Sequence, residues 1–162
     1  MTPAINLLKK NNIAHQVHEY THDVACTSYG LEAATKMGVA EARVFKTLVL
    51  NLSNGDLVIG ILPVSSLLSM KLISKAAGAK GATMADKNTV ERSTGYVLGG
   101  VSPLGQKKRL KTIIDQSAAA YTTIFISAGR RGLEIELNPE DLKQLTSATY
   151  VNICQKPNNG IN

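Results

Sequence analysis

One short histidine-rich segment, HEYTH from His18 to His22, matches the zinc-binding pattern HExxH. That pattern grips a metal only on a helix, where residues four apart share a face. The flanking residues alternate like a strand, and in an extended chain residues four apart lie roughly 13 Å from each other. We therefore expect surface or loop histidines and no metal site. A zinc-dependent hydrolase that uses this segment, with Cys26 as a further ligand, stays as the alternative.

A lysine interrupts the apolar segment VFKTLVLNL, residues 44–52. The strand period places Lys46 on one face with Leu48 and Leu50. An ammonium group among apolar side chains is costly unless it reaches water or finds a partner. Two interpretations stay open: a lysine near a strand end that reaches solvent, or a cation at the mouth of a pocket, aimed at a phosphate or a carbonyl. Thr47 follows on the opposite face, or at the rim if the strand twists there.

Glycines gather beside cations in STGYVLGGVSPLGQKKRLK, residues 93–111. Because glycine weakens a strand, four of them here indicate either a flexible loop or backbone that a ligand approaches closely. Two compact basic clusters beside glycines favour contact with phosphate over a merely solvated charged face. The first cluster is Lys107, Lys108, Arg109 and Lys111, and the second is Arg130 and Arg131 at the tip of a predicted hairpin.

Carboxylates alternate with apolar residues in LEIEL, residues 133–137. This alternation is typical of an amphipathic strand, on which Glu134 and Glu136 would be exposed to solvent. The chain has no nucleophile elbow, P-loop or dinucleotide-binding pattern, which excludes the common hydrolases and kinases. Cys26 and Cys154 lack metal-like spacing, and we interpret them as reduced thiols of a cytosolic protein.

Length and composition are those of one globular domain. The 162 residues are 44% hydrophobic with a formal charge of +6, so we expect a single domain over residues 1–155 and a disordered tail over 156–162. No apolar run approaches the ~20 residues of a membrane span, and the first residues are no secretory signal, so we expect a cytoplasmic protein with no membrane partner. The positive charge favours anionic partners, whereas 4% aromatic residues argue against a stacking platform for single strands.

Helical and strand patterns interleave without a steady βαβ rhythm. Helices are expected after Thr2, over 28–37, over 71–77, from Asp86 to about residue 92, and over 139–145. Strands are expected over 15–20, 44–52, 57–64, 96–101, 111–114, 122–127, 133–137 and 149–153, with a hairpin turn at 53–56. This order predicts an α+β fold with a mixed, strongly curved, barrel-like sheet flanked by helices.

Several stretches together resemble one family. The start MTPAINLLKKNNI, the segment FKTL, the block STGYVLGGVSPLGQKKRLKTIID and the end TIFISAGRRGLEIEL are similar to the YbaK-type aminoacyl-tRNA deacylases. The similarity extends to about Ile153. It implies the fold of the editing insertion of bacterial prolyl-tRNA synthetase and a protein that works in trans. It also implies removal of mischarged amino acids from tRNA, with cysteinyl-tRNA(Pro) as the substrate of the YbaK branch.

The resemblance also implies the roles of individual residues. Three of them fall on the catalytic centre: Lys46, Thr47 and Gly99, the glycine that holds the substrate carbonyl. The substrate pocket falls on Tyr20, Tyr29, Gly100, Ser127 and Glu134. The cations Lys107, Lys108, Arg109, Arg130 and Arg131 would bind the acceptor stem of tRNA. Departures from the family pattern at Tyr29, Ala128 and Glu134 leave the amino-acid preference open.

The mechanism implied by the resemblance needs no cofactor, metal or protein nucleophile. The thiol of the cysteinyl group attacks its own ester carbonyl and expels the tRNA as a thiolactone forms. The expected partners are aminoacyl-tRNA, through its 3′ end and acceptor stem, and prolyl-tRNA synthetase. A non-catalytic module that binds tRNA or the synthetase stays as a second alternative, and the oligomeric state stays open.

Overall fold

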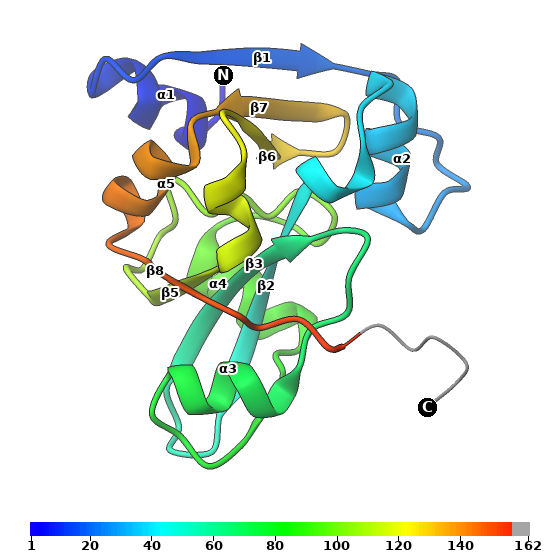
Figure 1. The fold of residues 1–162 in the computed structure, drawn as a ribbon. Helices are drawn as coiled ribbons and strands as arrows, with labels where there is room; N and C mark the ends of the chain where they lie inside the picture. Colours follow the sequence, from blue (N-terminus) through cyan, green and yellow to red (C-terminus); the bar gives the residue numbers. More distant parts are fainter. Residues whose placement is uncertain (157–162) are drawn as a thin grey trace.

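The computed structural model describes residues 1–156, so the predicted tail lies outside the described residues from position 157 on. Eight strands form two sheets (Figure 1). The strands are β1 His15–Glu19, β2 Phe45–Leu52, β3 Leu57–Pro63, β4 Ala82–Met84, β5 Lys111–Asp115, β6 Ile124–Arg130, β7 Leu133–Leu137 and β8 Thr149–Val151. The helices are α1 Pro3–Lys10, α2 Tyr29–Met37, α3 Met70–Ala76, α4 Lys87–Thr94 and α5 Pro139–Thr146, with 3-10 turns η1 Glu41–Arg43 and η2 Gln116–Ala120.

The smaller sheet is antiparallel and has the strand order β1-β7-β6. It lies at one end of the molecule, and α3 lies at the other (Figure 1). Helix α1 begins as predicted, because the Thr2 hydroxyl accepts a hydrogen bond from the Ile5 amide and a proline follows at the first turn. The same hydroxyl donates to the carbonyl of Ala128, which ties α1 to β6.

The larger sheet is mixed, with the strand order β4-β2-β3-β5-β8. The predicted hairpin of β2 and β3 is confirmed: the two strands pair antiparallel from Phe45 opposite Pro63 to Asn51 opposite Leu57. Gly55 in the turn has φ +93°, a conformation that favours glycine. The short strand β4, which the sequence did not predict, pairs with only three residues of β2, from Leu50 to Leu52.

Apolar side chains of β2 and β3 fill both sides of the larger sheet. Phe45, Val49 and Ile61 belong to the main core with α1, the small sheet and α5. Leu50 and Leu62 point the other way, into a second cluster under α3. The expected α+β class is confirmed, but the strands form two sheets joined by an isolated bridge from Val44 to Phe125, and closure into a barrel is not observed in residues 1–156.

One predicted strand, residues 96–101, is wrong. The chain from Gly95 to Leu110 is a loop without ladder pairing, which we call the glycine loop. Some of its backbone groups are satisfied within the loop and by α4, since the amide of Gly100 donates to Val97 and that of Lys107 to Thr94. Gly95, Gly99 and Gly105 have φ of +81°, +87° and +69°, which a strand does not adopt. The stretch is therefore a loop, and the close approach of a ligand to its glycines stays a prediction.

In the part of the chain that the structure describes, no helix combines the length and apolar character that a membrane span requires.

Candidate functional site

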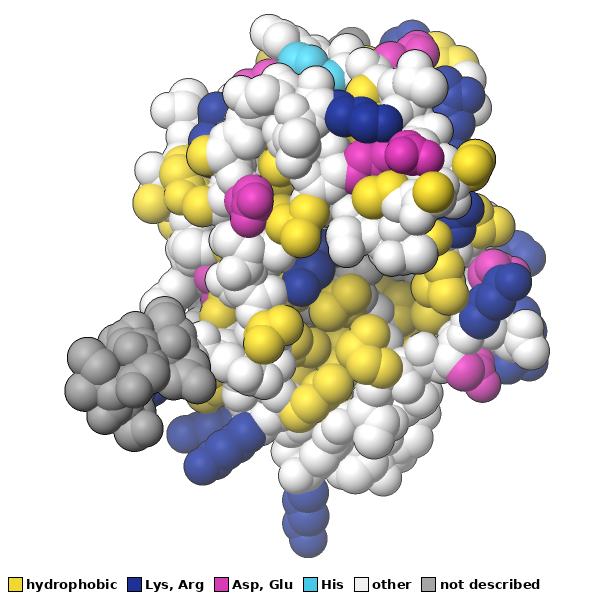
Figure 2. All heavy atoms as spheres, turned by 90° about the vertical axis from the view of Figure 1, so that its right-hand side faces the viewer, with side chains coloured by type: hydrophobic (Ala, Val, Ile, Leu, Met, Phe, Trp, Pro, Cys, Tyr) yellow, Lys and Arg dark blue, Asp and Glu magenta, His cyan; other side chains and the backbone are white. Residues whose placement is uncertain are grey.

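A pocket of about 460 Å³ opens where β2, the first turn of α2, the glycine loop and the small sheet meet. On the α2 side of the molecule the surface is hollowed, and hydrophobic side chains gather there beside a basic one (Figure 2). Seven of the eight predicted catalytic and substrate-binding residues line the pocket: Tyr20, Tyr29, Lys46, Thr47, Gly99, Ser127 and Glu134. Gly100, the eighth, is not among the lining residues.

The pocket exists because part of the β2 edge has no neighbouring strand. At one end of this edge Val44 bridges to Phe125 of β6, and at the other end β4 begins to pair only at Leu50. Four consecutive residues between these points, Phe45 to Leu48, line the pocket. Side chains from both faces of β2 therefore contribute to one site, although they alternate along the strand.

Lys46 is half-buried, and its Nζ donates to the carbonyl of Ser66 at 2.9 Å. It shares the face of Leu50 and Leu52, as the strand period predicted. Burial lowers the pKa of its ammonium, and no carboxylate forms an ion pair with it among the described residues. Of the two interpretations, the geometry supports a cation held at a pocket, with donors left for an anionic or carbonyl ligand.

Thr47 lies on the opposite face of β2, the side of the main core. Its Oγ1 is fully buried and has no hydrogen-bond partner within the described chain. An unpaired buried hydroxyl costs about 1–3 kcal/mol. Such a cost in the wall of a pocket indicates a polar group that the fold keeps for something other than its own stability.

Glu134 corrects the prediction that this carboxylate is exposed to solvent. It occupies the middle strand of the small sheet, opposite His18 on one side and Ser127 on the other, and only 7% of its surface is exposed. No hydrogen bond or ion pair to its carboxylate is found in residues 1–156, and burial raises its pKa to about 8. The face is covered because α2 and the start of β2 pack over it, around Phe125.

Two tyrosines form the pocket wall on the α2 side. The Tyr20 amide donates to the Gly132 carbonyl at 2.9 Å; burial and the nearby Glu134 raise its phenol pKa to about 12. Tyr29 is the first residue of α2. The preceding loop is attached to α2 through Glu32, whose carboxylate accepts hydrogen bonds from His22 and the Asp23 amide.

The HEYTH segment does not have the helical geometry that zinc binding requires. Its first residues form β1 and the rest a loop, so the extended conformation predicted for them is confirmed. His18 Nε2 lies 3.0 Å from Glu136 Oε1, and His22 Nδ1 lies 2.7 Å from Glu32 Oε1. Within residues 1–156, His, Cys, Asp and Glu side chains form no group of three or more that could hold a metal.

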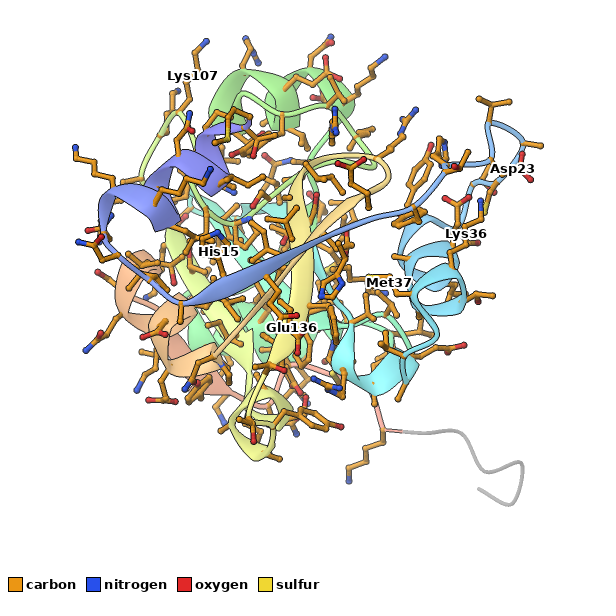
Figure 3. All side chains as sticks on the ribbon, turned by 90° about the horizontal axis from the view of Figure 1, so that it is seen from above. His15, Asp23, Lys36, Met37, Lys107 and Glu136 are labelled. Atoms are coloured by element: carbon orange, nitrogen blue, oxygen red, sulfur yellow. The ribbon has the colours of Figure 1, made fainter. Side chains whose placement is uncertain are left out.

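The first basic cluster lies apart from the pocket. Lys107 projects from the far side of the molecule from Lys36 and Met37 of α2 (Figure 3). Lys108 and Arg109 line a separate hollow of about 210 Å³. The second cluster is different: Arg130 and Arg131 form the tip of the β6–β7 hairpin, as predicted, and this tip packs against the glycine loop.

Sequence reasoning missed the apolar walls of the pocket. These are Leu31 and Leu48, Val64 of the turn after β3, and Leu98 and Val101 of the glycine loop. Apolar residues that line a pocket have the same types and spacing as core residues, so the sequence held no signal for them. Gly30 also lines the pocket, and a Cβ there would lie 2.2 Å from Val64 Cγ1, which only the structure shows.

Comparison with known proteins gives consistent results. A family model described as "Aminoacyl-tRNA editing domain" matches residues 26–145. The chain is 32% identical over 155 residues to the "Putative Cys-tRNA(Pro)/Cys-tRNA(Cys) deacylase EbsC" of Enterococcus faecalis, covering 96% of this chain and 94% of that protein. It is 30% identical over 125 residues to the uncharacterized protein YwhH of Bacillus subtilis, covering 76% and 79%.

Solved structures show the same fold at lower identity. One, described as a "putative trans-editing enzyme for prolyl tRNA synthetase", superposes with a TM-score of 0.80 at 21% identity and covers 94% of this chain and 93% of its own. Another, of a hypothetical protein, has a TM-score of 0.85 at 22% identity and covers 94% and 99%.

The burial of Glu134 predicts a pH dependence of stability. The folded chain keeps a proton on Glu134 up to about pH 8, whereas an ordinary glutamate releases it near 4.5. The folded state thus holds more protons between these values, and the free energy of unfolding falls as pH rises through this window. Measured by urea unfolding from pH 5 to 9, the free energy of unfolding of Glu134→Gln should fall less with rising pH than that of the wild type.

Glu136→Gln, on the same strand face, is the control. Its free energy of unfolding should depend on pH as in the wild type over this range, because hydrogen bonds from Thr123 and His18 lower the pKa of Glu136. Equal slopes in wild type and Glu134→Gln would contradict the burial of an unpaired carboxyl group.

The unpaired hydroxyl of Thr47 gives a second prediction. Thr47→Val keeps the shape and removes the buried hydroxyl, so the free energy of unfolding should rise by about 1 kcal/mol. Thr112→Val is the matched control, because that buried hydroxyl donates to the Leu110 carbonyl at 3.0 Å and its loss should destabilise the chain by about 1 kcal/mol. Urea unfolding measures both; destabilisation by Thr47→Val would mean that its hydroxyl has a partner.

Proposed function

This chain belongs to the aminoacyl-tRNA editing domain family, and on that premise we propose that it is a trans-editing deacylase that removes cysteine from Cys-tRNA(Pro) by substrate-thiol-assisted cleavage of the ester. The observation that carries the proposal is the meeting of Lys46, Gly99 and Glu134 in one pocket of about 460 Å³. Pockets of this size hold small ligands with a few polar groups at their walls, which suits the aminoacyl-adenosine end of tRNA.

The composition of the pocket supports a reaction in which the substrate supplies the nucleophile. No cysteine or histidine is among the described residues that line it. Ser127, which does line it, accepts a hydrogen bond from the Gly129 amide and has no neighbouring histidine base in the pocket wall. Cys154 is no substitute, because burial and the nearby Asp115 raise the pKa of its thiol to about 11, which disfavours the reactive thiolate.

We propose the following step. The substrate's cysteinyl sulfur attacks its own ester carbonyl, a C–S bond forms, and the C–O bond to the tRNA ribose breaks. The thiol proton passes to the released ribose oxygen, and a four-membered thiolactone leaves. Backbone groups at Gly99, which lines the pocket, would stabilise the charge on the carbonyl oxygen. The contribution of the protein is positioning and electrostatics.

The two buried ionisable groups would hold the ends of the substrate. Lys46, whose pKa burial lowers, would donate to the terminal ribose or phosphate, and an anionic ligand would oppose that lowering of the pKa. Glu134, protonated in the empty pocket below about pH 8, would bind the α-amino group. The apolar walls at Leu48 and Val64 favour an uncharged side chain such as that of cysteine.

In this proposal the acceptor stem contacts Lys107, Lys108, Arg109 and, at the hairpin tip, Arg130, with prolyl-tRNA synthetase as the partner and the cytoplasm as the location. Phosphate contacts of this kind weaken as salt rises. The cluster at Lys107 lies away from α2 (Figure 3), so in this proposal the duplex extends across the molecule from the bound 3′ end.

The decisive experiment is a deacylation panel with tRNA(Pro) charged with Cys, Ser, Ala or Pro. We expect Cys-tRNA(Pro) to react at least ~10-fold faster than Ser-tRNA(Pro), because the thiol is the better internal nucleophile. Equal Cys and Ser rates would show attack by water instead. Binding without turnover would favour the non-catalytic module. Loss of activity with EDTA and recovery with zinc would restore the zinc-dependent alternative.

Lys46 provides a separate prediction. Lys46→Met should lower the single-turnover rate by at least ~10²-fold, the cost of losing one electrostatic contact to the reacting ester end. Thermal unfolding should show no loss of stability, since replacing a half-buried ammonium with an apolar side chain removes a desolvation cost. Lys75→Met, at an exposed lysine of α3, is the control and should leave the rate unchanged. Full activity of Lys46→Met would remove this lysine from the mechanism.

A further inference from the structure

The tip of the β6–β7 hairpin packs directly against the glycine loop, and both of its arginines take part in this contact. Nη2 of Arg131 donates to the carbonyl of Leu98 at 2.7 Å. Its guanidinium carbon lies 4.6 Å from the centre of the Tyr29 ring. Arg131 therefore joins three parts of the pocket wall that are far apart in the sequence: the hairpin, the glycine loop and the first turn of α2.

This contact leaves no room for a side chain at the two central glycines of the loop. A Cβ on Gly99, which has φ +87°, would lie 2.4 Å from Nε of Arg131 and 2.9 Å from Cε2 of Tyr29. A Cβ on Gly100 would lie 2.7 Å from the Cα of Arg130, a backbone atom that cannot move aside. The bare backbone at this position thus makes room for the protein's own hairpin tip, behind the surface that a substrate would meet.

We propose that Arg131 is a positioning residue of the deacylation site, which fixes the Gly99 backbone and the Tyr29 ring through its guanidinium. This inference rests on the proposed function for its catalytic readout. A planar guanidinium can donate to a carbonyl and lie over an aromatic face at the same time, which an ammonium group cannot do with the same geometry. Since the carbonyl of Leu98 and Gly99 belong to one turn, holding the first sets the orientation of the second.

The neighbouring Arg130 is a matched control. It has the same charge and lies at the same tip, is exposed, and its side chain makes no hydrogen bond or ion pair in residues 1–156. Arg130 is therefore free to meet a phosphate, whereas Arg131 is already engaged. If both arginines served only the tRNA backbone, removing either would have the same effect on binding and on its salt dependence.

The test compares Arg131→Met with Arg130→Met in single-turnover deacylation of Cys-tRNA(Pro) across a range of salt concentrations. For Arg131→Met we expect the rate at saturating tRNA to fall at least ~10-fold, with KM within about twofold of wild type and an unchanged salt slope. For Arg130→Met we expect an unchanged saturating rate, a higher KM and a salt slope smaller by about 0.7–0.9. Identical behaviour of the two variants would overturn the inference.

Two further measurements separate this inference from the proposed function. Arg131→Lys keeps the charge, so full recovery of the rate by lysine would show that charge alone matters and would overturn the positioning role. Hydrogen exchange needs no substrate: amides of residues 98–100 should exchange faster in Arg131→Met than in wild type or Arg130→Met, with the global unfolding transition unchanged. Unchanged exchange would overturn the inference even if the protein is a deacylase. An inactive wild type with accelerated loop exchange would instead refute the proposed function alone.

Discussion

The close contact between the glycine loop and the tip of the β6–β7 hairpin is the constraint on which the site depends. Gly100 lies so close to the Cα of Arg130 that any side chain there would collide with backbone. This contact brings a loop from one part of the chain over the open edge of β2, and the pocket lies between them. Without it, Lys46 would lie on a strand edge open to solvent.

Two buried glutamates show how strongly nearby hydrogen-bond donors determine the pKa of a carboxyl group. Glu32 and Glu134 are each 7% exposed. Burial alone would raise both pKa values, but hydrogen bonds from the Asp23 amide, His22 and Lys36 lower that of Glu32 to about 2. Glu134 has no such donors and its pKa rises to about 8. The first carboxylate supports the loop before α2, and the second is left available in the pocket.

Unsatisfied groups gather at this one place. Within residues 1–156, the Thr47 hydroxyl is buried without a partner, the Lys46 ammonium donates only to a carbonyl, and the Glu134 carboxyl has no hydrogen-bond or ion-pair partner. Elsewhere the comparable groups are paired, as in the network of Glu136 with His18, Thr123 and Arg43. Fold stability alone does not account for such a concentration, whereas a polar ligand with complementary groups does.

Local sequence patterns determined most helices and strands and the strand face on which Lys46 lies. They could do so because helix caps, the alternation of side chains along a strand and turn glycines act over a few residues. They also placed the hairpin of β2 and β3. Only the tertiary structure decided that residues 96–101 form a loop, that Glu134 is buried, and that Arg131 is engaged. Each of these depends on a partner distant in the chain: α2 over the small sheet and the hairpin tip against Gly99 and Gly100. Such distant neighbours determine how far a side chain is buried and what its pKa is. The alternation of residue types along the sequence does not specify those neighbours.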